Sequence, residues 1–159
     1  SKRRDGGRGE DSNQREATPE EIASMRGIGR EAMAAGAAGL SSTHAPTHLD
    51  AADRPVPSRL ASKAELEALV NEVGLSNRGS ISYLPYSSIG GLDEADGNYL
   101  IELALGSRLP IIIQGLGARN KVDAPTATWE HSRAYLERAR GQGACVYSML
   151  MARPFNRRF

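Results

Sequence analysis

Residues 93–113, DEADGNYLIELALGSRLPIII, contain a helix pattern followed directly by a strand pattern. Asp93 is a preferred N-cap residue, and the apolar residues after it recur at helical spacing as far as Gly106. Residues 109–113, LPIII, are apolar and mostly β-branched, which is typical of a buried strand. A helix that leads into a buried strand is half of a βα crossover, so this stretch predicts an α/β fold.

The same helix-then-strand unit recurs on both sides of this stretch. Each further helix begins at a capping residue: Thr18 and Ser62 upstream, each with a glutamate three residues later, and Thr126 or Thr128 downstream. Predicted helices therefore alternate with predicted strands along the chain. These segments are residues 18–36, 37–43, 62–74, 81–84, 93–106, 109–113, 126–141 and 144–151.

Strict alternation of this kind predicts about four βα units that build one parallel sheet with right-handed connections. The strands are continuously apolar, which predicts burial on both faces of the sheet. A doubly wound sheet and part of a barrel fit this pattern equally well. In both architectures, chemistry is expected at the carboxyl ends of the strands.

Composition restricts the class of protein. The 159 residues carry a formal net charge of +1, and 40% of them are hydrophobic, which predicts a globular domain. The balanced charge argues against nucleic-acid binding, and no apolar run reaches the roughly 18 residues of a membrane span. The single cysteine, Cys145, is expected in the core and cannot form an internal disulfide, so we expect a reducing, cytoplasmic location.

Residues 1–17, SKRRDGGRGEDSNQREA, hold almost no apolar side chains. Such a segment cannot bury enough surface to offset the entropy of ordering it, so we expect a disordered tail. A basic arm that binds nucleic acid is the alternative, which the interleaved acidic residues disfavour. Residues 18–159 then form the folded part, and both ends of the chain are expected to be cut from a longer protein.

A proline-rich loop, residues 44–61, follows the first predicted strand and contains His44 and His48. Pro46 lies between the two histidines and rules out a shared helical face. In a loop they could still bind a metal together with a nearby aspartate. The alternative is a polar surface loop whose histidines hydrogen-bond locally.

Residues 114–121, QGLGARNK, follow the third predicted strand and combine glycines with cations. Gln114, Arg119 and Lys121 could bind an anion such as a carboxylate or phosphate, because their donors and the free backbone there suit one. Arg153, after the last strand, could bind the same ligand. The alternatives are a structural turn for the glycine-rich run and a solvated loop charge for Arg153.

Residues 18–61 resemble a segment of the amidohydrolase superfamily, in particular its N-acyl-D-amino-acid deacylase (D-aminoacylase) branch; the resemblance covers about residues 17–159 and is strongest over residues 31–58. The segment reads EAMAAGAAG over residues 31–39 and LSST over 40–43. A histidine-containing loop follows, with PVPS over 55–58. These elements are similar to the helix, the strand and the loop of that branch, in the same order.

The resemblance implies a zinc-dependent (β/α)8 barrel that hydrolyses the amide bond of a small molecule, an N-acyl-D-amino acid. The chain would then supply about four consecutive βα units, a partial barrel that is expected to be inactive as an isolated fragment. Histidines are typical at the ends of two consecutive strands in this region of the branch. Here those strand ends read YLP over residues 83–85 and IQG over 113–115, without a histidine. The alternative function is a non-catalytic α/β module that binds a small anionic ligand.

Overall fold

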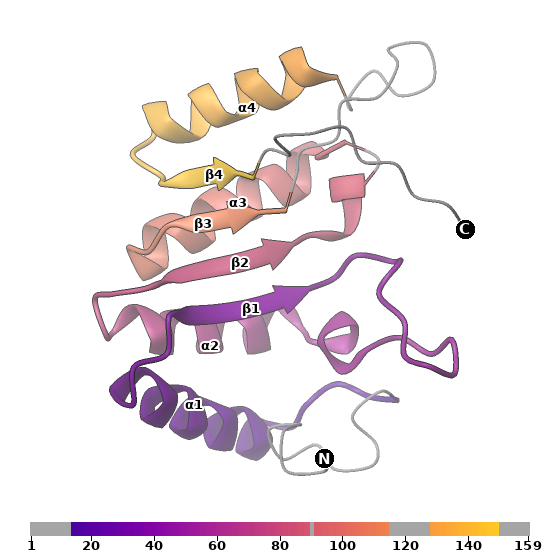
Figure 1. Ribbon diagram of the computed structural model, residues 1–159, viewed down its shortest axis with the longest axis vertical. Coiled ribbons are helices and arrows are strands. Elements are labelled where there is room, and N and C mark those ends of the chain that lie inside the picture. The colour runs from indigo at the N-terminus through magenta and orange to yellow at the C-terminus, as the bar shows by residue number, and fades with distance from the viewer. Residues whose placement is uncertain (1–13, 90, 115–127, 150–159) are drawn as a thin grey trace.

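The computed structural model describes residues 14–89, 91–114 and 128–149 as one four-stranded sheet with helices between the strands. All pairings are parallel, and the strand order is β1-β2-β3-β4 (Figure 1). The α/β class and the four βα units are therefore confirmed. The elements are α1 (Pro19–Ala34), β1 (Gly39–Thr43), η2 (Pro57–Leu60), α2 (Lys63–Gly74), β2 (Ser80–Leu84), η3 (Tyr86–Ile89), α3 (Glu94–Ser107), β3 (Ile111–Ile113), α4 (Trp129–Gly141) and β4 (Val146–Ser148).

Each α-helix begins at a side-chain cap that the sequence predicts. Thr18 accepts a hydrogen bond from the backbone of Glu21, whose carboxylate bonds back to Thr18 as in a complete capping box. The other three helices are capped by the side chains of Ser62, Asp93 and Thr128, each of which accepts from a backbone N–H three residues later.

The order of the strands distinguishes between the two architectures that the sequence leaves open. A doubly wound sheet reverses its strand order and places helices on both faces. Here the order is sequential, and α2 contacts both α1 and α3, as neighbouring helices do on one face of a sheet. Figure 1 shows α2 and α3 behind the sheet, with α1 and α4 beyond its two ends. The arrangement is that of a partial (β/α)8-type unit.

The core lies between the helices and one face of the sheet. Ile81, Tyr83, Ile111 and Ile113 point to that face and are buried. The alternate residues point to the opposite face, the inner face, where Ile112 is only half-buried and Tyr147 is 57% exposed. The prediction of burial on both faces is therefore wrong, because a continuously apolar strand such as β3 hides which face carries helices.

The start of β1 approaches β2 so closely that only glycine fits. A Cβ atom on Gly39 would lie 1.8 Å from the backbone oxygen of Ser80, and the φ angle of Gly39 is +147°. Both facts favour glycine at this position. The glycine therefore lets β1 and β2 pair in register from their first residues, Gly39 opposite Ser80.

One buried carboxylate joins α1 to α2. The Glu72 side chain is 1% exposed and accepts from Arg26 Nε at 2.9 Å and from Arg30 Nε at 2.7 Å. These charge-assisted hydrogen bonds, first of all that from Arg30, lower the pKa of Glu72. Met33 is the one buried residue of α1, and this ion-pair network adds a polar link from α1 to α2.

Three further predictions concern the N-terminal tail, Cys145 and membrane-spanning helices. Residues 1–13 of the expected tail lie outside the described residues, whereas Arg15 forms a two-pronged ion pair with Glu21, at 2.8 Å for each bond. Cys145 is exposed, so its expected core position is wrong. Among the described residues, no helix has the length and hydropathy that crossing a bilayer requires.

Candidate functional site

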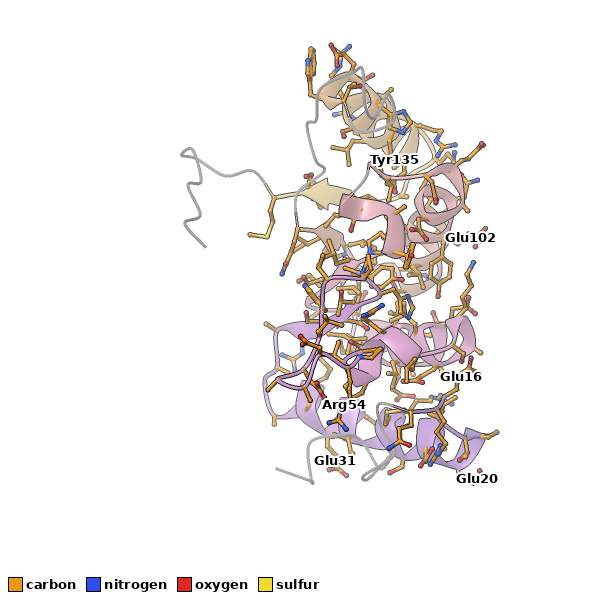
Figure 2. All side chains as sticks on the ribbon, turned by 90° about the vertical axis from the view of Figure 1, so that its right-hand side faces the viewer. Glu16, Glu20, Glu31, Arg54, Glu102 and Tyr135 are labelled. Carbon is orange, nitrogen blue, oxygen red and sulfur yellow. The ribbon has the colours of Figure 1, made fainter. Side chains whose placement is uncertain are left out.

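A small pocket lies at the carboxyl ends of the first three strands, with a cavity volume of about 160 Å³. We call it the strand-end pocket. Figure 2 views the molecule from this side, with Arg54 marking the loop between β1 and η2. The lining residues come from three strand ends and from this loop: Ser41, Ser42, Thr43, His48, Ser58, Ser82, Leu84 and Gln114.

The pocket lining is rich in polar side chains, and most of these have no hydrogen-bond partner among the described residues. Within the described part of the chain, no hydrogen bond engages the hydroxyls of the four serines, the imidazole of His48 or the amide of Gln114. The Thr43 hydroxyl accepts from the backbone of Ala45 at 3.1 Å. Unpaired donors and acceptors that converge on one hollow are the feature by which polar ligands are bound.

The described lining of the strand-end pocket carries little charge. Among the described residues that line it, His48 is the one titratable side chain, and the remainder are hydroxyls, an amide and Leu84. Its hydrogen-bonding capacity therefore suits a small polar group, either neutral or carrying a charge that neutral donors and one imidazole can neutralise. The volume suits a fragment of a ligand, since pockets for complete drug-sized molecules have volumes of about 300 Å³ or more.

The loop that carries His48 is fixed by a turn centred on Asp50. The Asp50 carboxylate accepts from the backbone N–H groups of Ala52 at 2.8 Å and Arg54 at 3.0 Å, and from Arg54 Nε at 2.9 Å. The backbone bonds to Arg54 and Ala52 lower the pKa of Asp50 to about 2. Arg54 Nη2 completes an ion pair with the same carboxylate at 2.8 Å. The turn is consequently preserved across the physiological pH range.

His44 ties the same loop to the sheet from the other end. Its Nε2 lies 3.0 Å from the carbonyl oxygen of Ala61, and its Nδ1 is hydrogen-bonded to the hydroxyl of Tyr83. Because a carbonyl only accepts, Nε2 carries the proton and Nδ1 accepts from Tyr83. Burial raises the pKa of Tyr83, which keeps its hydroxyl a donor. His44 thus joins the start and the end of the loop to β2.

The described residues do not fit a metal centre. Both ring nitrogens of His44 are hydrogen-bonded within the protein, and the Asp50 carboxylate is occupied by Arg54 and backbone donors. No group of three or more His, Cys, Asp or Glu side chains with metal-binding geometry occurs in the described ranges. His48 alone is a single ligand, whereas catalytic zinc takes three protein ligands.

The structure brings two of the residues that the sequence singles out into one site. His48 and Gln114 both line the strand-end pocket, although they lie on different loops. His44 is outside its lining and instead holds the loop. All three of the expected ligand-binding cations lie outside the described residues: Arg119, Lys121 and Arg153.

Sequence reasoning missed the serines of the strand-end pocket. Ser41 and Ser82 are register partners on neighbouring strands, and both point to the inner face. The available signal was the two-residue alternation of a strand, which puts Ser41 and Thr43 on the same face of β1. The contribution of Ser58 had no such signal, because it depends on how the loop folds back over the strand ends.

Comparison with known proteins identifies a shared fold. No family model and no curated protein matches the chain. Two solved structures of D-aminoacylase match over 85% of this chain, each with a TM-score of 0.60. The first, at 20% sequence identity, is described by the functional role of its binuclear metal centre. The second, at 21% identity, is described as defining a novel subset of amidohydrolases. A D-aminoacylase mutant in complex with copper chloride matches equally well, with a TM-score of 0.60. The chain spans about a quarter of the solved chains, 26% of their length, and has the fold of that segment of D-aminoacylase.

Proposed function

We propose that this chain forms part of an amidohydrolase that cleaves non-peptide C–N bonds, and that its strand-end pocket binds the polar part of an N-acyl amino acid. The observation that carries the proposal is the position of the pocket. It lies at the carboxyl ends of consecutive parallel strands, where barrel enzymes place their chemistry. The shared fold with D-aminoacylase supports this reaction class, and the sequence resemblance agrees with it.

The chemistry of the lining suits the amide and carboxylate groups of such a substrate. The serine hydroxyls and the Gln114 amide can donate to a carbonyl or carboxylate oxygen and accept from an amide N–H. His48 is the side chain that can take up or release a proton there. Arg119, Lys121 and Arg153 remain proposed partners of the substrate carboxylate.

The zinc that the resemblance implies has no ligand set among the described residues. We therefore assign no step of the reaction to a metal held by these side chains. A zinc centre in the intact enzyme would need its ligands from other residues. Titration of the 159-residue chain with zinc, followed by metal analysis after gel filtration, is expected to leave less than one zinc per chain.

A non-catalytic module that binds a small anionic ligand is the second candidate. The observation in its favour is that both ring nitrogens of His44 and the carboxylate of Asp50 are already engaged. The two candidates share the strand-end pocket and differ in turnover. Release of free amino acid from N-acetyl-D-amino acids by the full-length protein favours the hydrolase, whereas saturable binding by that protein without release favours the module.

The pocket itself is tested by binding of N-acetyl-D-amino acids to the 159-residue chain, measured by titration calorimetry. His48→Ala and Gln114→Ala are each expected to weaken binding by about tenfold, because each removes one hydrogen bond that is worth about 1.4 kcal/mol in this setting. His131→Ala is the matched control, because His131 lies on α4 and contacts the carbonyl of Leu92. Equal affinities of all four proteins would contradict the proposal.

A further inference from the structure

Another cavity lies at the end of the molecule opposite to the strand-end pocket, between the carboxyl ends of α1 and α2. Its volume is about 410 Å³, and we call it the helix-end cavity. Figure 1 shows these two helix ends at the left, near the amino ends of the strands. The lining residues come from α1, α2 and the turn after α2: Arg30, Met33, Ala34, Glu72, Leu75, Ser76 and Arg78. No residue of a described strand lines the cavity, so a strand added at either edge of the sheet would not fill it.

The helix-end cavity has more positive than negative charge around it. The Glu72 carboxylate has two arginine partners, Arg26 and Arg30, so the network of these three side chains retains one net positive charge. Arg78 lines the same cavity, and its guanidinium has no hydrogen bond or ion pair with a described residue. Among the described lining residues, Glu72 is the one acidic side chain. The surplus of positive charge favours an anion as the occupant.

Both arginines of the lining have donors left for such an anion. Arg30 bonds to Glu72 through Nε at 2.7 Å, and its side chain is 68% exposed, so its terminal Nη groups can bond to a ligand. Arg78 is exposed on the turn after α2. A guanidinium is planar and presents its N–H donors as a fork that matches the two oxygens of a carboxylate.

Local hydrogen bonds hold the turn that carries Arg78. Ser76 N donates to the carbonyl of Val73 at 3.1 Å. Asn77 N donates to the carbonyl of Gly74 at 3.0 Å. The Ser76 hydroxyl lies 2.7 Å from the carbonyl oxygen of Val73 and 3.0 Å from that of Arg78. The backbone of Arg78 is therefore positioned against α2 before a ligand binds, which lowers the entropic cost of binding.

An apolar surface lies beside these cations. Leu75 is 77% exposed, more than any other large hydrophobic residue of the described ranges, and it lines the cavity together with Met33 and Ala34. A ligand with an apolar part would remove the Leu75 side chain from water, which is favourable. The cavity volume lies within the range of small-molecule sites, about 300–1,000 Å³. The combination of guanidinium donors and an apolar surface suits a ligand that is charged at one end and apolar at the other.

We propose that the helix-end cavity binds an organic carboxylate with a short apolar chain. The carboxylate lies between Arg30 and Arg78. The chain lies along Leu75, Met33 and Ala34. Such a ligand connects the end of α1 to the turn after α2, and it stabilises the folded protein by mass action. The site is separate from the strand-end pocket, so this proposal goes beyond the proposed function and does not rest on it.

The test is binding of hexanoate to the full-length protein, followed by NMR on the resonances of the ligand. We expect saturable binding that is at least tenfold tighter than that of acetate, because the additional methylene groups cover Leu75. Hexan-1-ol, which has the same chain without the charge, is expected not to saturate. Absence of saturable hexanoate binding would overturn the proposal, as would equal affinities for acetate and hexanoate or inorganic phosphate binding as tightly as hexanoate.

Arg78→Gln tests the charge without disturbing the Glu72 network. We expect it to weaken hexanoate binding about tenfold, because it removes a charged, forked donor. Arg108→Gln is the matched control, because Arg108 is an exposed arginine at the corresponding position after α3 and does not line the helix-end cavity. Circular dichroism checks that each variant is folded. Equal hexanoate affinities of the two variants would contradict the assignment of Arg78.

Leu75→Ser tests the apolar contact and leaves both arginines in place. It is expected to reduce the preference for hexanoate over acetate to less than about threefold, with acetate binding unchanged. His48→Ala and Gln114→Ala, in the strand-end pocket, are expected to leave hexanoate binding intact. If these two variants weaken hexanoate binding and Arg78→Gln does not, the carboxylate binds in the strand-end pocket and the helix-end site is wrong. Failure to hydrolyse N-acetyl-D-amino acids bears on the proposed function alone.

Discussion

At the scale of single residues, Glu72 is the side chain with the clearest energetic role. Hydrogen bonds from Arg30 and Arg26 lower its pKa below the usual value of 4.5, so folding favours its ionised form. Its contribution is therefore complete above about pH 4.5 and is lost as the pH falls through the lowered pKa. We expect Glu72→Gln to reduce the free energy of unfolding at pH 7 by about 2 kcal/mol, and by progressively less in acid.

Urea denaturation at a series of pH values measures this effect. Glu31→Gln is the control, because Glu31 is exposed on α1, the helix that carries Arg26 and Arg30, and no ion pair joins it to the Glu72 network. A difference between wild type and Glu72→Gln that stays constant down to pH 2 would contradict the assignment.

Tyr83 is the second residue with a defined energetic role. Tyr83→Phe removes the donor to His44 Nδ1 and leaves that nitrogen part-buried without its partner. The expected loss is about 1–2 kcal/mol of unfolding free energy, together with weaker ligand binding, because His44 holds the loop that carries His48. Calorimetry and urea denaturation of the same variant measure both. Unchanged binding would show that the loop does not depend on this tie.

At the scale of the elements, glycines on β1 and α1 are expected to respond in opposite directions. Gly39→Ala would force a Cβ against the backbone of Ser80 and is expected to cost about 3 kcal/mol or more, since backbone atoms cannot move aside cheaply. Gly27→Ala meets nothing within 4 Å in the middle of α1 and is expected to stabilise by about 0.5–1 kcal/mol. Thermal unfolding of the two variants checks the signs, and a stable Gly39→Ala protein would refute the close approach.

Elements are also the level at which the sequence was most informative. The caps at Thr18, Ser62 and Asp93 act locally, so their residue types alone located three helix starts, and the fourth was predicted at Thr126 or Thr128, of which the structure shows Thr128. Which face of β3 is buried is not local, because Ile111 and Ile112 are the same residue type with different exposure. Only the position of the helices decides between them.

In the candidate site, too, some features could be predicted from the sequence and others depend on the fold. The rule that chemistry lies at strand ends selected His48 and Gln114, and both line the strand-end pocket. His44 and His48 have similar surroundings in sequence, and only the folded loop shows that His44 bonds to Tyr83 while His48 faces the pocket. Ser41 and Ser82 lie opposite each other because of the register between β1 and β2, and this register cannot be read from a single sequence.

At the scale of the whole molecule, stability is expected to be graded from the middle of the sheet outward. The amides of Ile81 and Ile111 are bonded within the sheet and their side chains are fully buried. Hydrogen exchange monitored by NMR should be slowest at β2 and β3 and faster in α1, which buries only Met33. Protection of α1 amides equal to that of Ile111 would contradict this gradient.

The Glu72 network also affects the order in which parts of the molecule unfold in acid. α1 lies beside β1 and is joined to α2 by the ion pairs of the Glu72 carboxylate as well as by packing, so protonating that carboxylate weakens the attachment of a helix that covers the edge of the sheet. Acid would then uncover a strand edge before the middle of the sheet unfolds. Mild acidification is therefore a condition in which copies of this chain would join strand to strand without order, and precipitation would precede denaturation.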